Sequence, residues 1–185
     1  MSGRLHDPVA RRAVLRWLAR APLVAAFAAG GAAAQQDASA RADVAPPRPV
    51  ARAEDRCPAC GMAVIDARFA AQARDSGGRT LVYDAIECLA DHRNGHAGPV
   101  PGDGPAWLAD RAASSAAEAV WLPVEDAVVL HHPRLRTPMG GGLAAFVDVP
   151  AALGFAEANA LADATTYGWA DVLALGVPRP WVPVR

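Results

Sequence analysis

The pattern of hydrophobic and polar positions predicts an α+β fold beyond residue 57. Apolar and polar residues mix over 66–74, and a β-prone run occupies 79–83. The pair Gly77-Gly78 between them is a tight-turn signal, so these two stretches are expected to form a hairpin.

A short helix is expected directly after this hairpin. Asp84 is a favourable N-cap residue, and Glu87 follows at the spacing of a capping box. Apolar residues at helical spacing extend the pattern to about Arg93, and Asn94-Gly95 is a helix-ending signal.

The second half of the chain repeats this plan. Each half has a loop with a methionine (Met62, Met139), a strand with a phenylalanine (Phe69, Phe146) and a helix. The sequence therefore predicts two small related strand-strand-helix-strand units packed together, at about 57–105 and 119–176. In the second unit, strands are expected over 119–124, 127–131 and 143–149, and helices over 150–162 and 168–176.

The N-terminal segment resembles an export signal. Arg11-Arg12 begins a twin-arginine-like motif, and the apolar run over 21–34 is shorter than the ~20 residues of a membrane-spanning helix. Three alanines end this run and fit a cleavage site at residue 34. We therefore expect a periplasmic protein that is exported with a cleaved signal peptide, although an uncleaved anchor is the alternative. No cysteine lies near the cleavage region, so no lipid anchor is predicted.

Composition separates the remaining segments. Residues 35–56 are rich in Ala, Pro, Arg and Asp without apolar periodicity, which predicts a disordered, flexible linker. The region 57–176 is the predicted metal-binding part, and 177–185 is a C-terminal tail. The formal net charge of −1 provides no global field that would draw the protein to nucleic acid or anionic lipid.

The chemistry centres on the run Cys-Pro-Ala-Cys-Gly-Met at 57–62. Met62 lies two residues after a thiol, and Met139 lies in a glycine-rich loop, where core side chains are uncommon. Thiolates and thioethers are soft ligands that select Cu(I). Gly61 would let Cys60 and Met62 face one ion. The predicted metal ligands are therefore Cys57, Cys60, Met62 and Met139, with Cu(I) as the metal.

Two other interpretations remain open. The set Cys57, Cys60, Cys88 and His92 has the spacing of a small structural zinc site. The CxxC pair alone could belong to a thiol oxidoreductase, although no strand-before, helix-after pattern surrounds it. His131 or His132 could add a nitrogen ligand, but adjacent strand residues point to opposite faces.

Several motifs together resemble the NosL family of nitrous oxide reductase accessory proteins. They are Cys60-Gly61-Met62, Arg68-Phe69-Ala70-Ala71-Gln72, Tyr83-Asp84, and the stretch from Thr137-Pro138-Met139 to Phe146. The resemblance implies two small related α+β units and a Cu(I) chaperone, not an enzyme. The family's ligands correspond to Cys60, Met62 and Met139.

The resemblance also implies partners. They are nitrous oxide reductase, whose multicopper centre would receive the copper in denitrification, and its membrane ABC-type maturation complex. Neither nucleic acid nor a small-molecule substrate is expected as a partner. Family members are usually lipoproteins, whereas this chain has an Arg-Arg leader without a lipid-attachment cysteine. No Ser/His/Asp set, catalytic carboxylate pair or phosphate loop occurs in the sequence, which favours a carrier over an enzyme.

Overall fold

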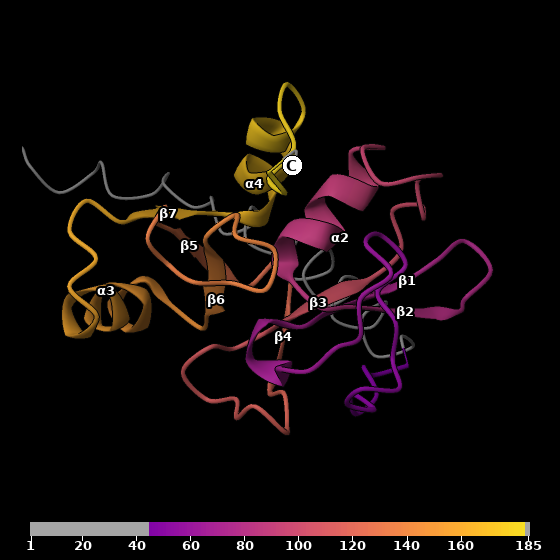
Figure 1. Cartoon of the computed structure of the whole chain (residues 1–185), viewed down its shortest axis with the longest axis horizontal. Helices are drawn as coiled ribbons and strands as arrows, with labels where there is room; N and C mark the ends of the chain where they lie inside the picture. Colours follow the sequence, from indigo (N-terminus) through magenta and orange to yellow (C-terminus); the bar gives the residue numbers. More distant parts are fainter. Residues whose placement is uncertain (1–44, 184–185) are drawn as a thin grey trace, which may run out of the picture. The chain divides into compact units, whose positions relative to one another are not determined.

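A computed structural model describes residues 45–183 of the chain (Figure 1). The predicted export signal, 1–34, and the first part of the predicted linker lie outside the described residues. The described part has an α+β architecture of two small antiparallel sheets with three helices, as the sequence predicts.

The first unit contains a four-stranded sheet and one α-helix. Its strands lie in the order β2-β1-β3-β4, all antiparallel to their neighbours. The hairpin predicted around Gly77-Gly78 is confirmed, with Ala71 opposite Tyr83. The elements are the 3-10 helix η1 (Ala67–Phe69), β1 (Ala71–Arg74), β2 (Thr80–Tyr83), α2 (Ile86–Arg93), β3 (Ala106–Ala109) and β4 (Trp121–Pro123).

The second unit contains a three-stranded sheet and two α-helices. Its strands lie in the order β6-β5-β7, again all antiparallel. Asp148 caps α3 by accepting a hydrogen bond from the Ala151 N–H (2.8 Å), and Pro150 lies in the first turn as predicted. The elements are β5 (Val128–His131), β6 (Leu143–Phe146), α3 (Val149–Ala158), β7 (Thr165–Tyr167) and α4 (Trp169–Gly176).

The predicted repeat of a strand-strand-helix-strand unit is confirmed. In each unit the first strand is central, the second and third strands flank it, and a helix connects those two. Three details of the prediction are wrong. Phe69 lies in the 3-10 helix η1 and not in a strand. Met62 precedes β1, whereas Met139 lies between β5 and β6, so the methionine loops are not equivalent. Strand β4 belongs to the first sheet, so the second unit does not begin at residue 119.

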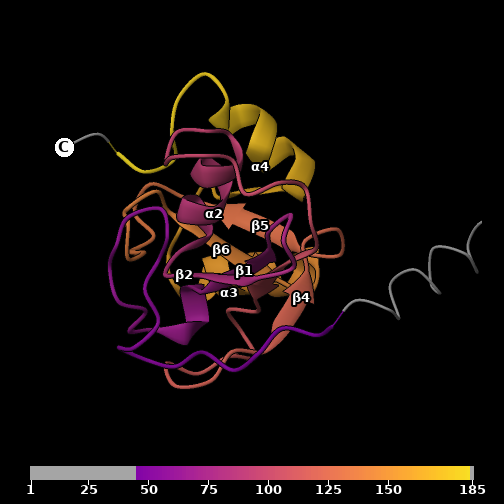
Figure 2. The ribbon, with the colours of Figure 1, turned by 90° about the vertical axis from the view of Figure 1, so that its right-hand side faces the viewer.

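Helix α2 packs against both sheets and against α4 (Figures 1 and 2). Its residues from Ile86 to His92 are all buried. The main apolar core surrounds it and combines residues of both units, including Leu108 of β3, Val129 of β5 and Leu143 of β6. The two units therefore share the main core, and the second unit has a smaller core of its own around Phe146.

The predicted N-cap of this helix is wrong. Helix α2 begins after Ala85, which makes no side-chain capping bond. Asp84 and Glu87 have the spacing of a capping box, but their side chains point to partners elsewhere in the fold. The predicted helix end is confirmed, because Asn94 is the C-cap and Gly95 adopts a φ of 78°.

The C-terminal tail also packs onto α2. Asp91 accepts hydrogen bonds from the backbone N–H groups of Trp181 and Val182, both at 2.8 Å. The Trp181 indole N–H donates to the carbonyl of Val172 in α4 (2.9 Å). These bonds tie the end of the described chain to the buried helix.

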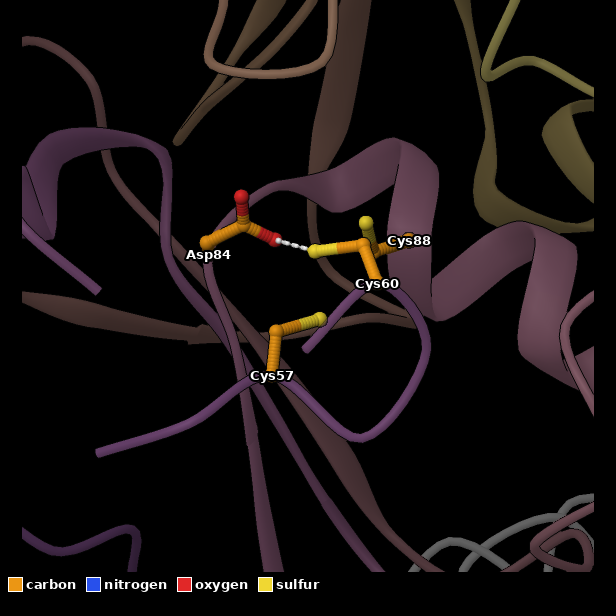
Figure 3. Close-up of side chains that lie close together, drawn as sticks. All are labelled: Cys57, Cys60, Asp84 and Cys88. Carbon is orange, nitrogen blue, oxygen red and sulfur yellow. Dashed lines mark hydrogen bonds between the residues drawn. The ribbon is translucent and has the colours of Figure 1, made fainter. Parts of the chain in front are cut away.

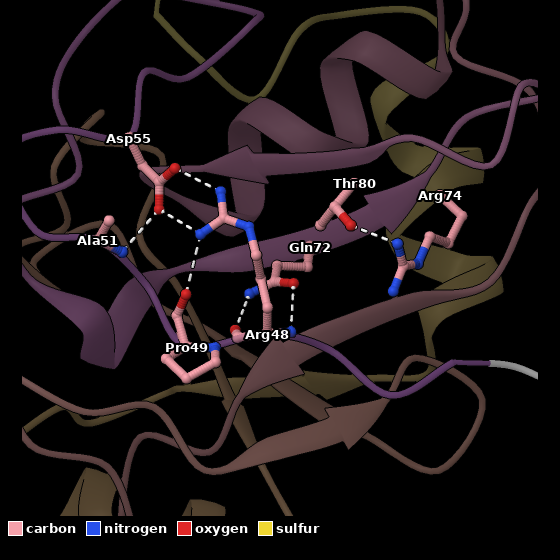
Figure 4. A network of polar contacts seen from close by, with 7 residues as sticks. All are labelled: Arg48, Pro49, Ala51, Asp55, Gln72, Arg74 and Thr80. Atoms are coloured by element: carbon pink, nitrogen blue, oxygen red, sulfur yellow. Dashed lines mark hydrogen bonds and ion pairs between the residues drawn. The ribbon is translucent and has the colours of Figure 1, made fainter.

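The second half of the predicted flexible linker is packed, which corrects that prediction for residues 45–56. The buried side chain of Gln72 on β1 bonds both the N–H and the carbonyl of Arg48 (Figure 4). Arg48 pairs with Asp55, which also accepts the Ala51 N–H (2.7 Å). An isolated antiparallel bridge between Arg56 and Ala63 then closes the loop 57–62, called here the cysteine loop. Among residues 45–183, helices of the length and apolarity that a bilayer crossing requires are absent.

Gln72 should therefore control the attachment of this segment. Gln72→Met should lower the free energy of unfolding by about 1–3 kcal/mol, because it leaves the backbone groups of Arg48 without these partners. The control Arg48→Met removes a half-exposed ion pair and should cost less than about 1 kcal/mol. Urea unfolding measures both. Equal losses in the two variants would contradict this ranking.

Candidate metal centre

The cysteine loop folds back on itself. The Cys57 N–H donates to the carbonyl of Met62 (2.9 Å), and the Gly61 N–H donates to the carbonyl of Cys57 (2.8 Å). Gly61 adopts a φ of 76°, a conformation that glycine reaches without steric cost. This closed loop brings the two thiols of the CxxC pair to the same side.

The start of α2 completes a cluster of four potential ligands. The sulfur atoms of Cys57, Cys60 and Cys88 and a carboxylate oxygen of Asp84 all lie within 4.8 Å of one another (Figure 3). Two ligands of one ion at ~2.3 Å can be up to ~4.6 Å apart, so the side chains need only small shifts to share an ion. The residues present therefore fit a metal ion.

Exposure differs across the cluster. Cys57 and Cys88 are each 1% exposed and Asp84 is 2% exposed, whereas Cys60 is only half-buried. Met62, two residues further along, is 43% exposed. The cluster thus has a closed interior and one accessible side, which the Cys60–Met62 stretch forms.

Asp84 contributes an oxygen that lacks a partner. The Cys60 thiol donates to Asp84 Oδ1 at 3.4 Å, while Oδ2 is buried without a hydrogen-bond partner among the described residues. A buried carboxylate oxygen without a partner is costly in a native fold. A bound cation would satisfy it.

The three thiols differ in acidity. A hydrogen bond from Cys88 and backbone N–H groups of Asp84 and Cys60 lower the pKa of Cys57 to about 7. Desolvation raises the pKa of Cys60 to about 12. The pKa of Cys88 is raised because its proton is held by Cys57 and because it is buried. At neutral pH the metal-free cluster therefore holds its first thiolate at Cys57, and an ion must displace protons from the other thiols.

The structure brings two of the four predicted ligands, Cys57 and Cys60, into one cluster. Met62 and Met139 lie in different loops. Met139 is half-buried against the core that also contains Cys57 and Cys88. Ligation by the two thioethers stays a prediction. Asp84 was missed as a cluster member, although its spacing of four residues from Cys88 at a helix start was a usable signal.

The histidines lie elsewhere. His92, the fourth residue of the zinc alternative, bonds the Tyr83 hydroxyl through Nδ1 at 3.0 Å and is not part of the cluster. Both ring nitrogens of His132 have partners, the Ala162 carbonyl and the Arg134 N–H. The His131 ring packs edge-on against Trp181, with 5.3 Å between centroids.

The acidity of Cys57 leads to a pH prediction. Below about pH 7, Cys57 is protonated in the metal-free protein, so metal binding must displace one more proton than above it. The apparent affinity for a thiol-bound metal ion should fall more steeply with acidity below about pH 7 than above. Competition titrations against a metal chelator measure this. Cys57→Ser should remove the change of slope, and a constant slope in the unchanged protein would contradict the assignment.

A comparison with solved structures finds a likeness to a NosL protein. The crystal structure of the copper chaperone NosL from Shewanella denitrificans matches with a TM-score of 0.51 and 14% sequence identity. The match covers 66% of this chain and 93% of that chain. Searches against protein-family models and curated protein sequences returned no match. At this identity the likeness shows the fold, so the chain has a NosL-like fold.

Proposed function

We propose that this protein binds Cu(I) as cargo and delivers it to a partner protein. The observation that carries the proposal is the convergence of three thiols from two separate segments on one point. Thiolates are soft ligands that favour Cu(I), and partial exposure on one side permits transfer.

The arrangement of the thiols supports carriage. Cys57 and Cys88 form the protected inner side of the site, and Cys60 lies at the accessible side. A partner's ligand would reach the ion next to Cys60 first. Copper would then pass by stepwise exchange, in which each new bond to the partner replaces one bond to this chain. The released thiolates of Cys60 and Cys88 take up protons from water. Copper stays Cu(I) throughout and is never released as a free ion.

Thioethers are the second part of this proposal. Met62 follows Cys60 on the exposed side, and Met139 lies in the 137–142 turn packed on the same core. We propose that both assist Cys60 in holding Cu(I), because thioethers bind Cu(I) without displacing a proton. Cys57 completes the set expected from the sequence, and Cys88 joins it from α2.

The fold supports a specific cellular role for copper delivery. The NosL protein that the structure resembles is named as a copper chaperone. We propose the corresponding role here: a periplasmic carrier, exported with a cleaved signal peptide, that supplies copper for maturation of nitrous oxide reductase through its ABC-type complex. The role is that of a binding protein and not of an enzyme.

A zinc site is the second candidate, and Asp84 is the observation that favours it. Three thiolates and one carboxylate form a four-ligand set that Zn²⁺ accepts, whereas a carboxylate is a poor ligand for Cu(I). In the zinc interpretation Asp84, instead of His92, is the fourth ligand.

One titration separates the two candidates. The full chain is titrated anaerobically with Cu(I) and with Zn(II), each against a chelator of known affinity, and the complexes are weighed by native mass spectrometry. We expect one Cu(I) per chain, and Cu(I) should displace Zn(II). Retention of Zn(II) against excess Cu(I), or unfolding of the protein when zinc is chelated, would overturn the carrier proposal.

Substitutions then locate the site. Cys60→Ser should weaken Cu(I) binding by at least about 100-fold, and Met62→Leu by about tenfold, because each removes one soft ligand. Ile65→Leu is the matched control, since Ile65 is 61% exposed near the same loop and offers no ligand. An unchanged affinity in Cys60→Ser would place the copper elsewhere.

A further inference from the structure

The most unusual buried group outside the thiol cluster is the carboxyl group of Glu87. It lies in the first turn of α2, next to Cys88, and is 0% exposed. Its Oε2 atom has no hydrogen-bond partner within the described part of the chain. No ion pair with Glu87 occurs among residues 45–183. Burial of a carboxyl group costs free energy unless hydrogen bonds compensate for it, so the hydrogen bonds that Glu87 does make are important for the fold.

These contacts all lead to the turn that carries Met139. The Thr137 hydroxyl donates to Glu87 Oε1 at 2.5 Å, and the Leu143 N–H donates to the same oxygen at 3.3 Å. Thr137 begins the 137–142 turn, and Leu143 directly follows it. Glu87 therefore holds both ends of this turn with one carboxylate oxygen.

The hydroxyl of Thr137 extends this bonding into the turn itself. It accepts the N–H groups of Gly140 (3.1 Å) and Gly142 (3.2 Å) while it donates to Glu87. Gly141 lies directly against the carboxylate stem: a Cβ atom there would be 2.5 Å from Glu87 Cγ. The turn is thus shaped to lie on Glu87, and Met139 occupies its middle.

We propose that Glu87 is a positioning residue that holds the Met139 turn beside the thiol cluster, so that Met139 can supply its thioether to the bound ion. This inference rests on the proposed binding of Cu(I). Helix α2 then serves two ligands through adjacent residues: Cys88 faces the ion directly, and Glu87 sets the place of Met139 through Thr137.

The chain offers a clean spectroscopic test, because it contains only three methionines, Met1, Met62 and Met139. The full chain is labelled with ¹³C-methyl methionine, and signals are assigned with Met62→Leu and Met139→Leu. Cu(I) is added anaerobically to one equivalent. In the unchanged protein we expect the Met139 methyl signal to shift when Cu(I) binds.

Thr137→Val removes the hydroxyl with little change of shape and should abolish most of the Met139 shift. The thiolate-to-copper absorption should remain, with affinity about 10- to 100-fold weaker. Thr137→Ser retains the hydroxyl and should restore both. Glu87→Ala should act like Thr137→Val, whereas Glu87→Gln keeps an acceptor oxygen and should behave like the unchanged chain. Amide spectra before copper addition confirm that each variant is folded.

Each outcome decides a separate point. A full Met139 shift in folded Thr137→Val or Glu87→Ala would overturn the positioning role. Loss of the shift in Glu87→Gln or Thr137→Ser as well would assign the effect to packing and overturn it too. If Cu(I) binds the unchanged chain without moving the Met139 signal, this inference fails while thiol binding stands. If no Cu(I) binds, the proposed function itself fails.

Discussion

Complete burial of a short helix is the constraint on which this structure depends. Seven of the eight residues of α2 are buried, and three of them, Glu87, Asp91 and His92, are polar. Each of these three needs a partner inside the protein, and each finds it in a different segment: the 137–142 turn, the C-terminal tail and strand β2. The polar side chains of one helix therefore hold three other stretches of chain in place, two of which are distant in the sequence.

The same helix makes the metal centre possible. Its first turn supplies Cys88 from the interior, while the loop of Cys57 and Cys60 approaches from outside the helix. Neither segment alone has three thiols. Because α2 cannot move without exposing its buried face, the distance between these segments is set by core packing. The ion would add to this order without having to create it.

Local patterns in the sequence predicted the elements that depend on local signals. The Gly77-Gly78 hairpin and the end of α2 at Asn94 are examples. Strands β3 and β7 were not predicted, since strands of three or four residues carry too little periodicity. The two methionine loops looked equivalent because sequence order does not show which strands a loop connects.

The metal centre was predictable to a similar degree. Spacing alone identified Cys57 and Cys60 as a pair, and the i, i+4 relation connected Cys88 to a helix face. The part played by Asp84 was hidden, because a helix-capping aspartate and a metal-facing aspartate occupy the same sequence position. In the structure Ala85, with an extended backbone, is the N-cap of α2, so Asp84 does not cap the helix and its side chain faces the thiols. His92 was assigned to zinc because its bond to Tyr83 involves a fold contact that spacing cannot reveal.

The two units have the same topology but unequal duties. All three thiols belong to the first unit, and the second unit contains no cysteine at all. The second unit contributes the 137–142 turn, which packs on α2 of the first unit. The first unit therefore holds the reactive thiols, and the second unit supports the helix that carries one of them. Under the proposed function, a substitution in the second unit would change how tightly the metal ion is held without altering any thiol.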